Sequence, residues 1–167
     1  MDSEIYQLRP AVGHDIDFLY RVYAGTRHQE MAATGWSEAQ AEQFLRFQFT
    51  IQNIQYRNCY KNASFDIICR DGEPAGRLYV SRTENLIRII DIALLPEFRN
   101  HGIGTAVLRD IAAEAVASCR PLTLSVAFDN PAVALYRRIG FEITGDDGVY
   151  YTLEYNITHT AGTLCTA

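Results

Sequence analysis

Apolar and polar positions recur at changing intervals along the chain, and each change predicts a different element. Residues 5–10 alternate apolar with polar side chains, which is typical of a strand. Residues 16–23 place apolar side chains on one face of a predicted helix. A second, longer helix is expected over about 37–60, because a capping-box pattern stands at its start. From Ser64 the period changes to two, which predicts strands.

Two more helices separate the later strands. Asp71-Gly72 predicts a hairpin turn, and residues 106–117 and the segment around Tyr136 predict helices. Strands are expected at residues 5–10, 65–70, 76–81, 87–95, 122–127, 141–144 and 150–155. This order predicts an α/β (α+β) fold with a mixed, mostly antiparallel sheet and helices on both faces. No linker or repeat interrupts the pattern, so residues 1–157 are expected to form one domain, with 158–167 as a disordered tail.

Composition narrows the class of protein. A chain of 167 residues has the length of one domain, and 48% hydrophobic with 21% charged residues is typical of a globular protein. No apolar run approaches the roughly 20 residues of a membrane span. A net charge of −5 argues against a nucleic-acid partner. Four cysteines lack metal-ligand spacing, so we expect no metal and four unpaired thiols. These thiols and an acidic N-terminus unlike a secretory signal predict a cytoplasmic protein.

Residues 99–105, Arg-Asn-His-Gly-Ile-Gly-Thr, lie between a predicted strand and a predicted helix. A glycine-rich turn before a helix presents free backbone N–H groups and the positive end of the helix dipole, which bind phosphate. Gly102 and Gly104 leave room for close approach, and Arg99 adds a charge that pairs with phosphate. A dinucleotide-binding turn would need a third glycine in place of Val107, and a P-loop would need a lysine after Gly104. The loop therefore predicts a site for another pyrophosphate.

The pattern that remains, R-x-x-G-x-G, resembles the acetyl-CoA loop of the GCN5-related N-acetyltransferase (GNAT) family. Residues 130–141 resemble the other signature of that family, N-x-x-A-x-x-L-Y-x-x-x-G-F, in the same order and at the usual distance. Within this segment Asn130 suits a helix cap, Pro131 the first turn and Gly140 the helix end. The motifs cover about residues 89–141, and the flanking elements agree only in number and order.

The resemblance implies a sheet splayed near its middle, with acetyl-CoA as the cosubstrate that enters the gap. It implies an acyltransferase that transfers the acetyl group directly to a primary amine in a ternary complex. No cysteine occupies a motif position that would suggest a covalent acyl-enzyme. Backbone groups of the strand before the loop would bind the pantetheine arm and polarise the thioester carbonyl. The implied cofactor-binding residues are Ile92, Ala93, Leu94, Arg99, Asn100, His101, Gly102, Ile103, Gly104, Thr105 and Asn130.

Two residues are candidates for catalysis. Tyr136 matches the usual general acid of the family, because a phenol can protonate the departing thiolate; the alternative is a core aromatic residue. Ser125 stands where the family often has a glutamate base, which leaves Asp91, a carboxylate in an apolar run, as the candidate base. Asp91 could equally form a structural pair with a nearby arginine, and a water-relayed proton is a third alternative.

The acceptor is expected to be a small-molecule amine, and its identity stays open. The acyl chain length and the oligomeric state also stay open, and a homodimer is one alternative. In the family the second helix helps to build the acceptor pocket, so six residues on or near this helix are candidates for the pocket lining. Ordinary helix packing explains each of these residues as well. Those candidates are Trp36, Gln43, Phe47, Gln48, Gln52 and Tyr56. A catalytically silent acyl-CoA-binding module that regulates a partner is the alternative function.

Overall fold

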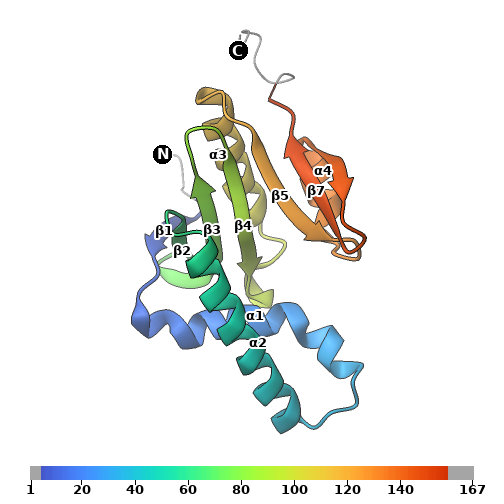
Figure 1. Ribbon diagram of the computed structural model, residues 1–167. Helices are drawn as coiled ribbons and strands as arrows, with labels where there is room; N and C mark the ends of the chain where they lie inside the picture. The colour runs from blue at the N-terminus through green and yellow to red at the C-terminus, as the bar shows by residue number, and fades with distance from the viewer. Residues whose placement is uncertain (1–4, 158–167) are drawn as a thin grey trace. The chain divides into compact units, whose positions relative to one another are not determined.

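A mixed, open sheet of seven strands organises the fold, in the spatial order β1-β2-β3-β4-β5-β7-β6 (Figure 1). The strands are β1 (Gln7–Pro10), β2 (Ser64–Arg70), β3 (Glu73–Arg82), β4 (Ile87–Leu94), β5 (Leu122–Ala127), β6 (Phe141–Asp146) and β7 (Tyr150–Tyr155). β1 pairs antiparallel with β2, β4 pairs parallel with β5, and β7 pairs antiparallel with both β5 and β6. The predicted mixed α/β fold is therefore confirmed.

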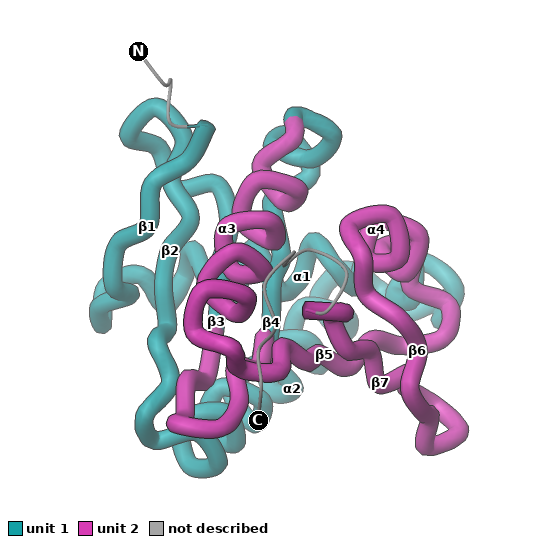
Figure 2. The backbone as a smooth tube through the Cα atoms, turned by 90° about the horizontal axis from the view of Figure 1, so that it is seen from above, with its two compact units in different colours: residues 1–79, 91–101 teal, residues 80–90, 102–167 magenta. Residues whose placement is uncertain are grey.

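The computed structural model describes residues 5–157, and the chain divides into two compact units (Figure 2). Unit 1 holds residues 1–79 and 91–101, and unit 2 holds residues 80–90 and 102–167. β3 and β4 each run from one unit into the other. The pairing of β4 with β5 covers Ile87–Ile89, which lie in unit 2. The expected tail at 158–167 lies outside the described residues.

In unit 1, α1 (Ile16–Ala32) packs against α2 (Glu38–Cys59). The Tyr20 and Tyr23 rings lie 5.8 and 5.7 Å from the Phe49 ring, centroid to centroid, and form the centre of this contact. The predicted capping box begins α2. The Ser37 hydroxyl accepts the Gln40 backbone N–H at 3.2 Å, and the Gln40 side-chain oxygen accepts the Ser37 N–H at 3.0 Å.

A buried carboxylate fixes the start of α1. Asp15 lies in the 3₁₀ turn η1 (Gly13–Asp15), and its two oxygens each accept a hydrogen bond of 2.8 Å from Arg9 of β1. One of them also accepts the Val12 N–H at 2.8 Å. The bonds from Arg9, followed by the Val12 N–H, outweigh burial and lower the pKa of Asp15 to about 2. The pair ties the edge strand to the first helix.

In unit 2, α3 (Ile103–Ala117) and α4 (Ala132–Ile139) accompany β5, β6 and β7. α3 buries one face through Ile103, Val107, Leu108, Ile111, Ala112 and Ala115. Near its end Glu114 accepts bonds from the Arg82 Nε and Nη2 at 2.8 and 2.9 Å, and these bonds lower the pKa of Glu114. This fork holds the end of β3 to α3.

The bounds of several elements differ from the sequence predictions, among them β3, which begins at Glu73 instead of residue 76. The last hairpin turns at Asp147 to Val149, beyond the predicted end of its first strand at residue 144, because the Asp147 carboxylate accepts the N–H groups of Val149 and Tyr150 at 2.9 and 2.7 Å. β6 is correspondingly longer and carries an irregularity between Ile143 and Gly145. α3 begins three residues earlier than predicted, directly after Gly102.

The expectation of four unpaired thiols is wrong. Cys59 and Cys69 are free, but Cys119 is disulfide-bonded, and Cys165 lies outside the described residues. Within residues 5–157 no helix is long and apolar enough to cross a membrane. The same residues contain no cluster of His, Cys, Asp and Glu side chains suited to a metal ion.

Candidate active site

The loop between β4 and α3 has the backbone that its glycines predicted. A short 3₁₀ turn, η2 (Pro96–Phe98), is followed by Asn100 and Gly102, which both have positive φ angles, 60° and 82°. Within the described part of the chain no side chain caps α3, so its first N–H groups point out of the helix end without a side-chain acceptor. This end is suited to an anion such as a pyrophosphate.

The space beside the two loop glycines is open. A Cβ atom placed on Gly102 or Gly104 would have no described atom within 4 Å. Gly102 needs its glycine for the left-handed backbone, whereas Gly104 lies in α3 with ordinary helical geometry. The open space beside Gly104 therefore supports a ligand site more directly than Gly102 does, because the backbone at Gly104 does not itself require glycine.

The side chain of Arg99 holds the loop in place. Its Nε donates to the Leu94 carbonyl at 2.9 Å, and its Nη2 donates to the Gly25 carbonyl of α1 at 3.3 Å. Arg99 therefore joins the end of β4 to α1 as well as carrying a positive charge in the loop. The neighbouring side chains of Asn100 and His101 are exposed.

Gly76 was missed in the sequence, and it sets the shape of β4 before the loop. A Cβ atom at Gly76 would collide with the Ala93 carbonyl oxygen and with Leu94. The Leu95 N–H also donates to the Ala75 carbonyl at 2.9 Å. β3 and β4 therefore approach so closely here that only glycine fits. A glycine inside an apolar strand was the available signal.

Asp91 forms a buried ion pair with Arg77 of β3. The Arg77 Nη2 lies 2.6 Å from Asp91 Oδ2, and the exposed fractions of the two side chains are 3% and 16%. The same Nη2 donates to the Gln52 side-chain oxygen at 3.1 Å, and the Tyr56 hydroxyl lies 3.4 Å from Asp91 Oδ2. The structural alternative for Asp91, a pair with a nearby arginine, is therefore present, and β3, β4 and α2 bring its members together.

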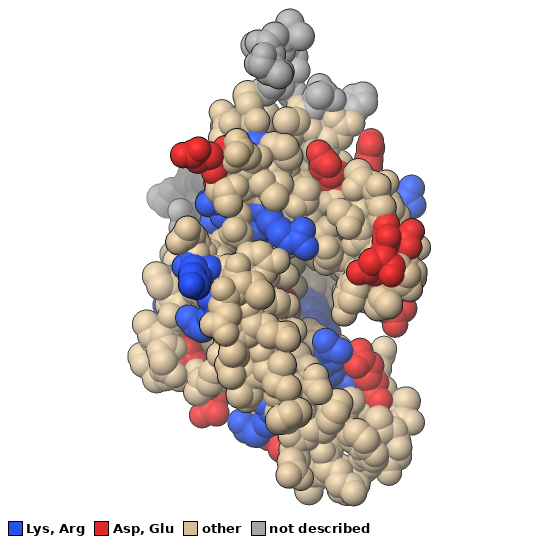
Figure 3. Space-filling model, viewed as in Figure 1, with Lys and Arg blue, Asp and Glu red and all other residues tan. Residues whose placement is uncertain are grey.

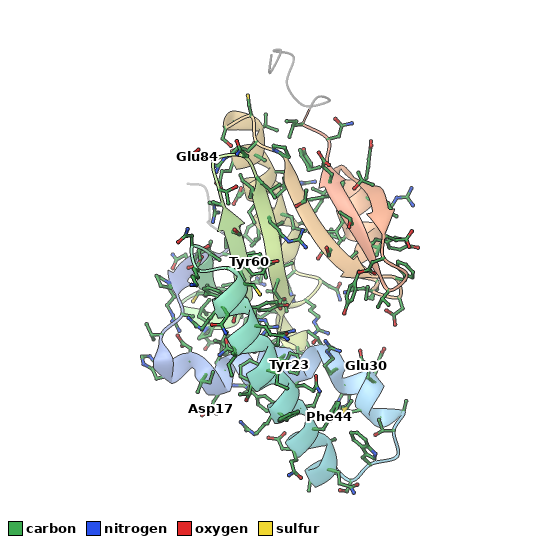
Figure 4. The ribbon with its side chains drawn as sticks, in the orientation of Figure 1. Asp17, Tyr23, Glu30, Phe44, Tyr60 and Glu84 are labelled. Carbon is green, nitrogen blue, oxygen red and sulfur yellow. The ribbon has the colours of Figure 1, made fainter. Side chains whose placement is uncertain are left out.

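Aromatic rings enclose the guanidinium of this pair. The Arg77 Cζ lies 5.9 Å from the centroid of Tyr23, labelled in Figure 4, and 5.3 Å from that of Tyr79. The Nε of Arg77 is buried and has no hydrogen-bond partner among the described residues. An arginine placed among aromatic rings needs the Asp91 charge beside it, because an unpaired buried cation is costly.

The electrostatics of the cluster favour neutral phenols and a charged arginine. Burial raises the pKa of Tyr56, and the Asp91 carboxylate raises it further. Burial also raises the pKa of Tyr23 and of Tyr79. For Arg77, burial acts to lower the pKa, but the Asp91 charge reverses this and leaves it raised. The phenols are hydrogen-bond donors at neutral pH, and the Asp91 carboxylate accepts hydrogen bonds from Arg77 and Tyr56.

The second motif lies in unit 2. Tyr136, on α4, is 7% exposed, and its ring meets Phe141 edge-on at 5.9 Å between centroids. Asn130 is exposed, and its side-chain oxygen accepts the N–H of Ala132, the first residue of α4, at 2.9 Å; the cap position itself is Pro131, one residue later than predicted. Gly140 ends the helix with a φ of 124°.

The structure divides the residues predicted for an acceptor pocket on α2. Gln52 and Tyr56 face the Arg77–Asp91 pair. Phe47 is 62% exposed, and Trp36, also exposed, packs edge-on against Phe44 at 5.2 Å between ring centroids. Phe47 lies on another side of α2 and Trp36 precedes the helix, so neither faces the Arg77–Asp91 pair as Gln52 and Tyr56 do.

Comparison with known proteins agrees with the two motifs. The model of the acetyltransferase (GNAT) family matches residues 22–141. No curated protein sequence matches the chain significantly.

Solved structures share the fold over nearly their whole length. The PaiA N-acetyltransferase of Thermoplasma acidophilum, in complex with coenzyme A, is 18% identical; the match covers 90% of this chain and 98% of that one, with a TM-score of 0.68. An acetyltransferase of Thermus thermophilus is 21% identical over 92% and 98% of the chains, with a TM-score of 0.65. A GNAT family acetyltransferase of Elizabethkingia anophelis with acetyl-CoA bound is 16% identical over 92% and 99%, with a TM-score of 0.58.

Proposed function

This chain belongs to the acetyltransferase (GNAT) family and is an acetyl-CoA-dependent acyltransferase, and we propose that it acetylates a primary amine directly in a ternary complex. One observation carries the proposal. The loop from Arg99 leads into the uncapped start of α3, with open space beside Gly104. Such a helix start supplies N–H donors and a positive dipole end for a pyrophosphate. The coenzyme A and acetyl-CoA bound in two structures of the same fold support this ligand.

In the proposed reaction the amine nitrogen bonds to the carbonyl carbon and the carbon–sulfur bond breaks. Backbone N–H groups of Ile92 to Leu94 polarise the carbonyl oxygen, so the side chains there are little constrained. Tyr136 donates its hydroxyl proton to the leaving thiolate. Asn130 lies near the pantetheine end of the cosubstrate. The acceptor is a small-molecule amine.

Asp91 accepts the proton that the amine loses. Its Oδ2 is held by Arg77, whereas Oδ1 has no hydrogen-bond partner among the described residues, which supports Oδ1 as the accepting atom. Arg77 orients the carboxylate and does not itself take part in proton transfer, because a guanidinium stays charged. A water-relayed proton is the alternative route.

One observation favours the second candidate, a silent acyl-CoA-binding module. The Arg77 guanidinium at 2.6 Å competes with an amine for Asp91, and a carboxylate committed to this pair would be no base. In that case the chain would bind acetyl-CoA and transfer nothing.

An acceptor screen separates the two functions. Small amines, amino acids, amine-bearing antibiotics and a peptide with a free N-terminus are each incubated with acetyl-CoA and the protein, and free CoA thiol is measured. We expect at least one amine to accelerate thiol release above the rate with water alone. Tight acetyl-CoA binding without acceleration by any amine would instead identify the silent module.

A further inference from the structure

The outer face of α2 carries an apolar stripe that no described residue of unit 1 covers. Phe44, Phe47, Ile51 and Ile54, here called the α2 stripe, are exposed by 38%, 62%, 37% and 54%. Their spacing of three, four and three residues is that of the a and d positions of a heptad. They therefore lie in one line along the helix, and Trp36 extends that line by packing on Phe44, labelled in Figure 4.

The core of unit 1 does not account for these residues. α2 already contributes Leu45 and Phe49 to the contact with α1, from the opposite side of the helix. Gln52 and Tyr56 continue that inward side toward Asp91. α2 is thus apolar on two faces, and among residues 5–157 only one of them packs against the rest of the chain. A helix that is apolar on a second face normally buries it against another helix.

We propose that the α2 stripe is the interface at which two copies of this chain associate, with their α2 helices packed antiparallel about a two-fold axis. In that arrangement, centred between Phe47 and Ile51, Phe47 of one copy lies against Ile51 of the other. Phe44 then lies against Ile54. Each large ring meets a smaller aliphatic side chain, so the stripe is complementary to itself, as an isologous contact requires.

Charge on α2 is compatible with this self-association. Glu42 accepts from Arg46 at 2.7 Å and from the Tyr20 hydroxyl at 2.6 Å, and Arg46 lies over the Tyr20 ring, so both charges are used on the α1 side. The side chains that flank the stripe are uncharged: Gln43, Gln48, Thr50 and Gln55. The surface over α2 in Figure 3 accordingly has few charged side chains. No like charges would meet across the two-fold axis.

The exposed area is sufficient for a reversible dimer. From the exposed fractions, the stripe and Trp36 present on the order of 450 Å² of apolar surface per chain. Two copies would bury about 900 Å², and the flanking amides bring the total above the ~1,000 Å² at which specific interfaces begin. An interface of this size predicts a dimer that dissociates on dilution.

Sedimentation equilibrium of the full chain at tens of micromolar tests the interface. We expect a mass about twice the 18.9 kDa of one chain for the native protein, falling toward 18.9 kDa on dilution. The double variant Phe47→Lys, Ile51→Lys should stay monomeric, because four like charges would meet at the axis. Val149→Lys is the matched control: this residue is an exposed apolar side chain of unit 2, and its variant should still dimerise.

A mixing experiment distinguishes contact between copies from every other occupant. Phe47→Glu, Ile51→Glu should also be monomeric alone, but an equimolar mixture with the lysine variant should regain the mass of a dimer. A native protein that stays monomeric at tens of micromolar, or a lysine variant that keeps the dimer mass, would overturn the proposal. Failure of the mixture to associate would do so as well. None of these measurements depends on acetyl transfer.

Discussion

Replacing Asp91 with asparagine should cost both stability and activity, and the two losses have different origins. Asparagine keeps the shape of the side chain but leaves Arg77, 3% exposed, without its counter-charge. Breaking a buried pair from one side costs about 3–5 kcal/mol. Because Asp91 itself is 16% exposed, we expect the lower end, about 3 kcal/mol. For a chain of this length that lowers the melting temperature by about 6–12 °C.

Removing the buried cation as well should restore much of the stability. Arg77→Met leaves Asp91 unpaired but partly exposed, so we expect a loss of about 1–2 kcal/mol. In the double variant Arg77→Met, Asp91→Asn neither charge is left unpaired. We expect it to be at least about 2 kcal/mol more stable than the sum of the single losses predicts. Urea unfolding of the four proteins measures this coupling, and additivity within about 0.5 kcal/mol would refute the ion pair as a source of stability.

Activity should not return with stability. If Asp91 accepts the amine proton, the double variant keeps a depressed kcat/KM and a flattened acidic limb of its pH profile, although it is folded. Recovery of kcat/KM and of the acidic limb in the double variant would mean that Asp91 is structural, and that the proton leaves through water or another residue.

Four further substitutions test other parts of the account. Gly104→Val should abolish acetyl-CoA affinity in a calorimetric titration, because its side chain would fill the space that the ligand needs. Its melting temperature should change little, because no described atom lies in that space. Arg99→Ala should weaken acetyl-CoA affinity less than Gly104→Val does. Tyr136→Phe should lower kcat about 10²-fold or more with unchanged acetyl-CoA affinity, and an unchanged kcat would leave Tyr136 a packing residue. Since the pKa of Asp15 is lowered to about 2, its ionised carboxylate stabilises the fold above about pH 4, and this stabilisation is lost as the pH falls toward 2. Asp15→Asn should therefore flatten the dependence of the free energy of unfolding on pH in that window.

Local chemistry made part of the structure predictable. The capping box at Ser37, the hairpin turn at Asp71-Gly72 and the glycine-rich loop each depend on residues adjacent in sequence, and the structure has all three. Asp71 and Gly72 both adopt the positive φ angles that such a turn requires, 52° and 83°. Short-range signals of this kind survive folding because no distant partner is needed to satisfy them.

Other features required knowledge of which segments meet. An aspartate in the apolar run of β4 predicted a partner or a function, but only strand adjacency selects Arg77, 14 residues earlier in the chain. Likewise, helical periodicity placed Phe47 and Gln52 on α2 without indicating which face turns toward the sheet. The structure turns Gln52 inward and leaves Phe47 in solvent. Arg77 in an apolar strand was the overlooked signal, since a buried arginine must be paired.

The most direct test of the central claim follows the acetyl group itself. The protein is incubated with acetyl-CoA labelled in the acetyl carbon, with and without the amine selected by the acceptor screen. Label is then measured on the amine and on the protein, and free CoA thiol is counted in parallel. Direct transfer predicts one labelled amide for each CoA released, no label on the protein, and no release above background without amine. Label on the protein before amine is added, or CoA release without a labelled amide, would contradict the account.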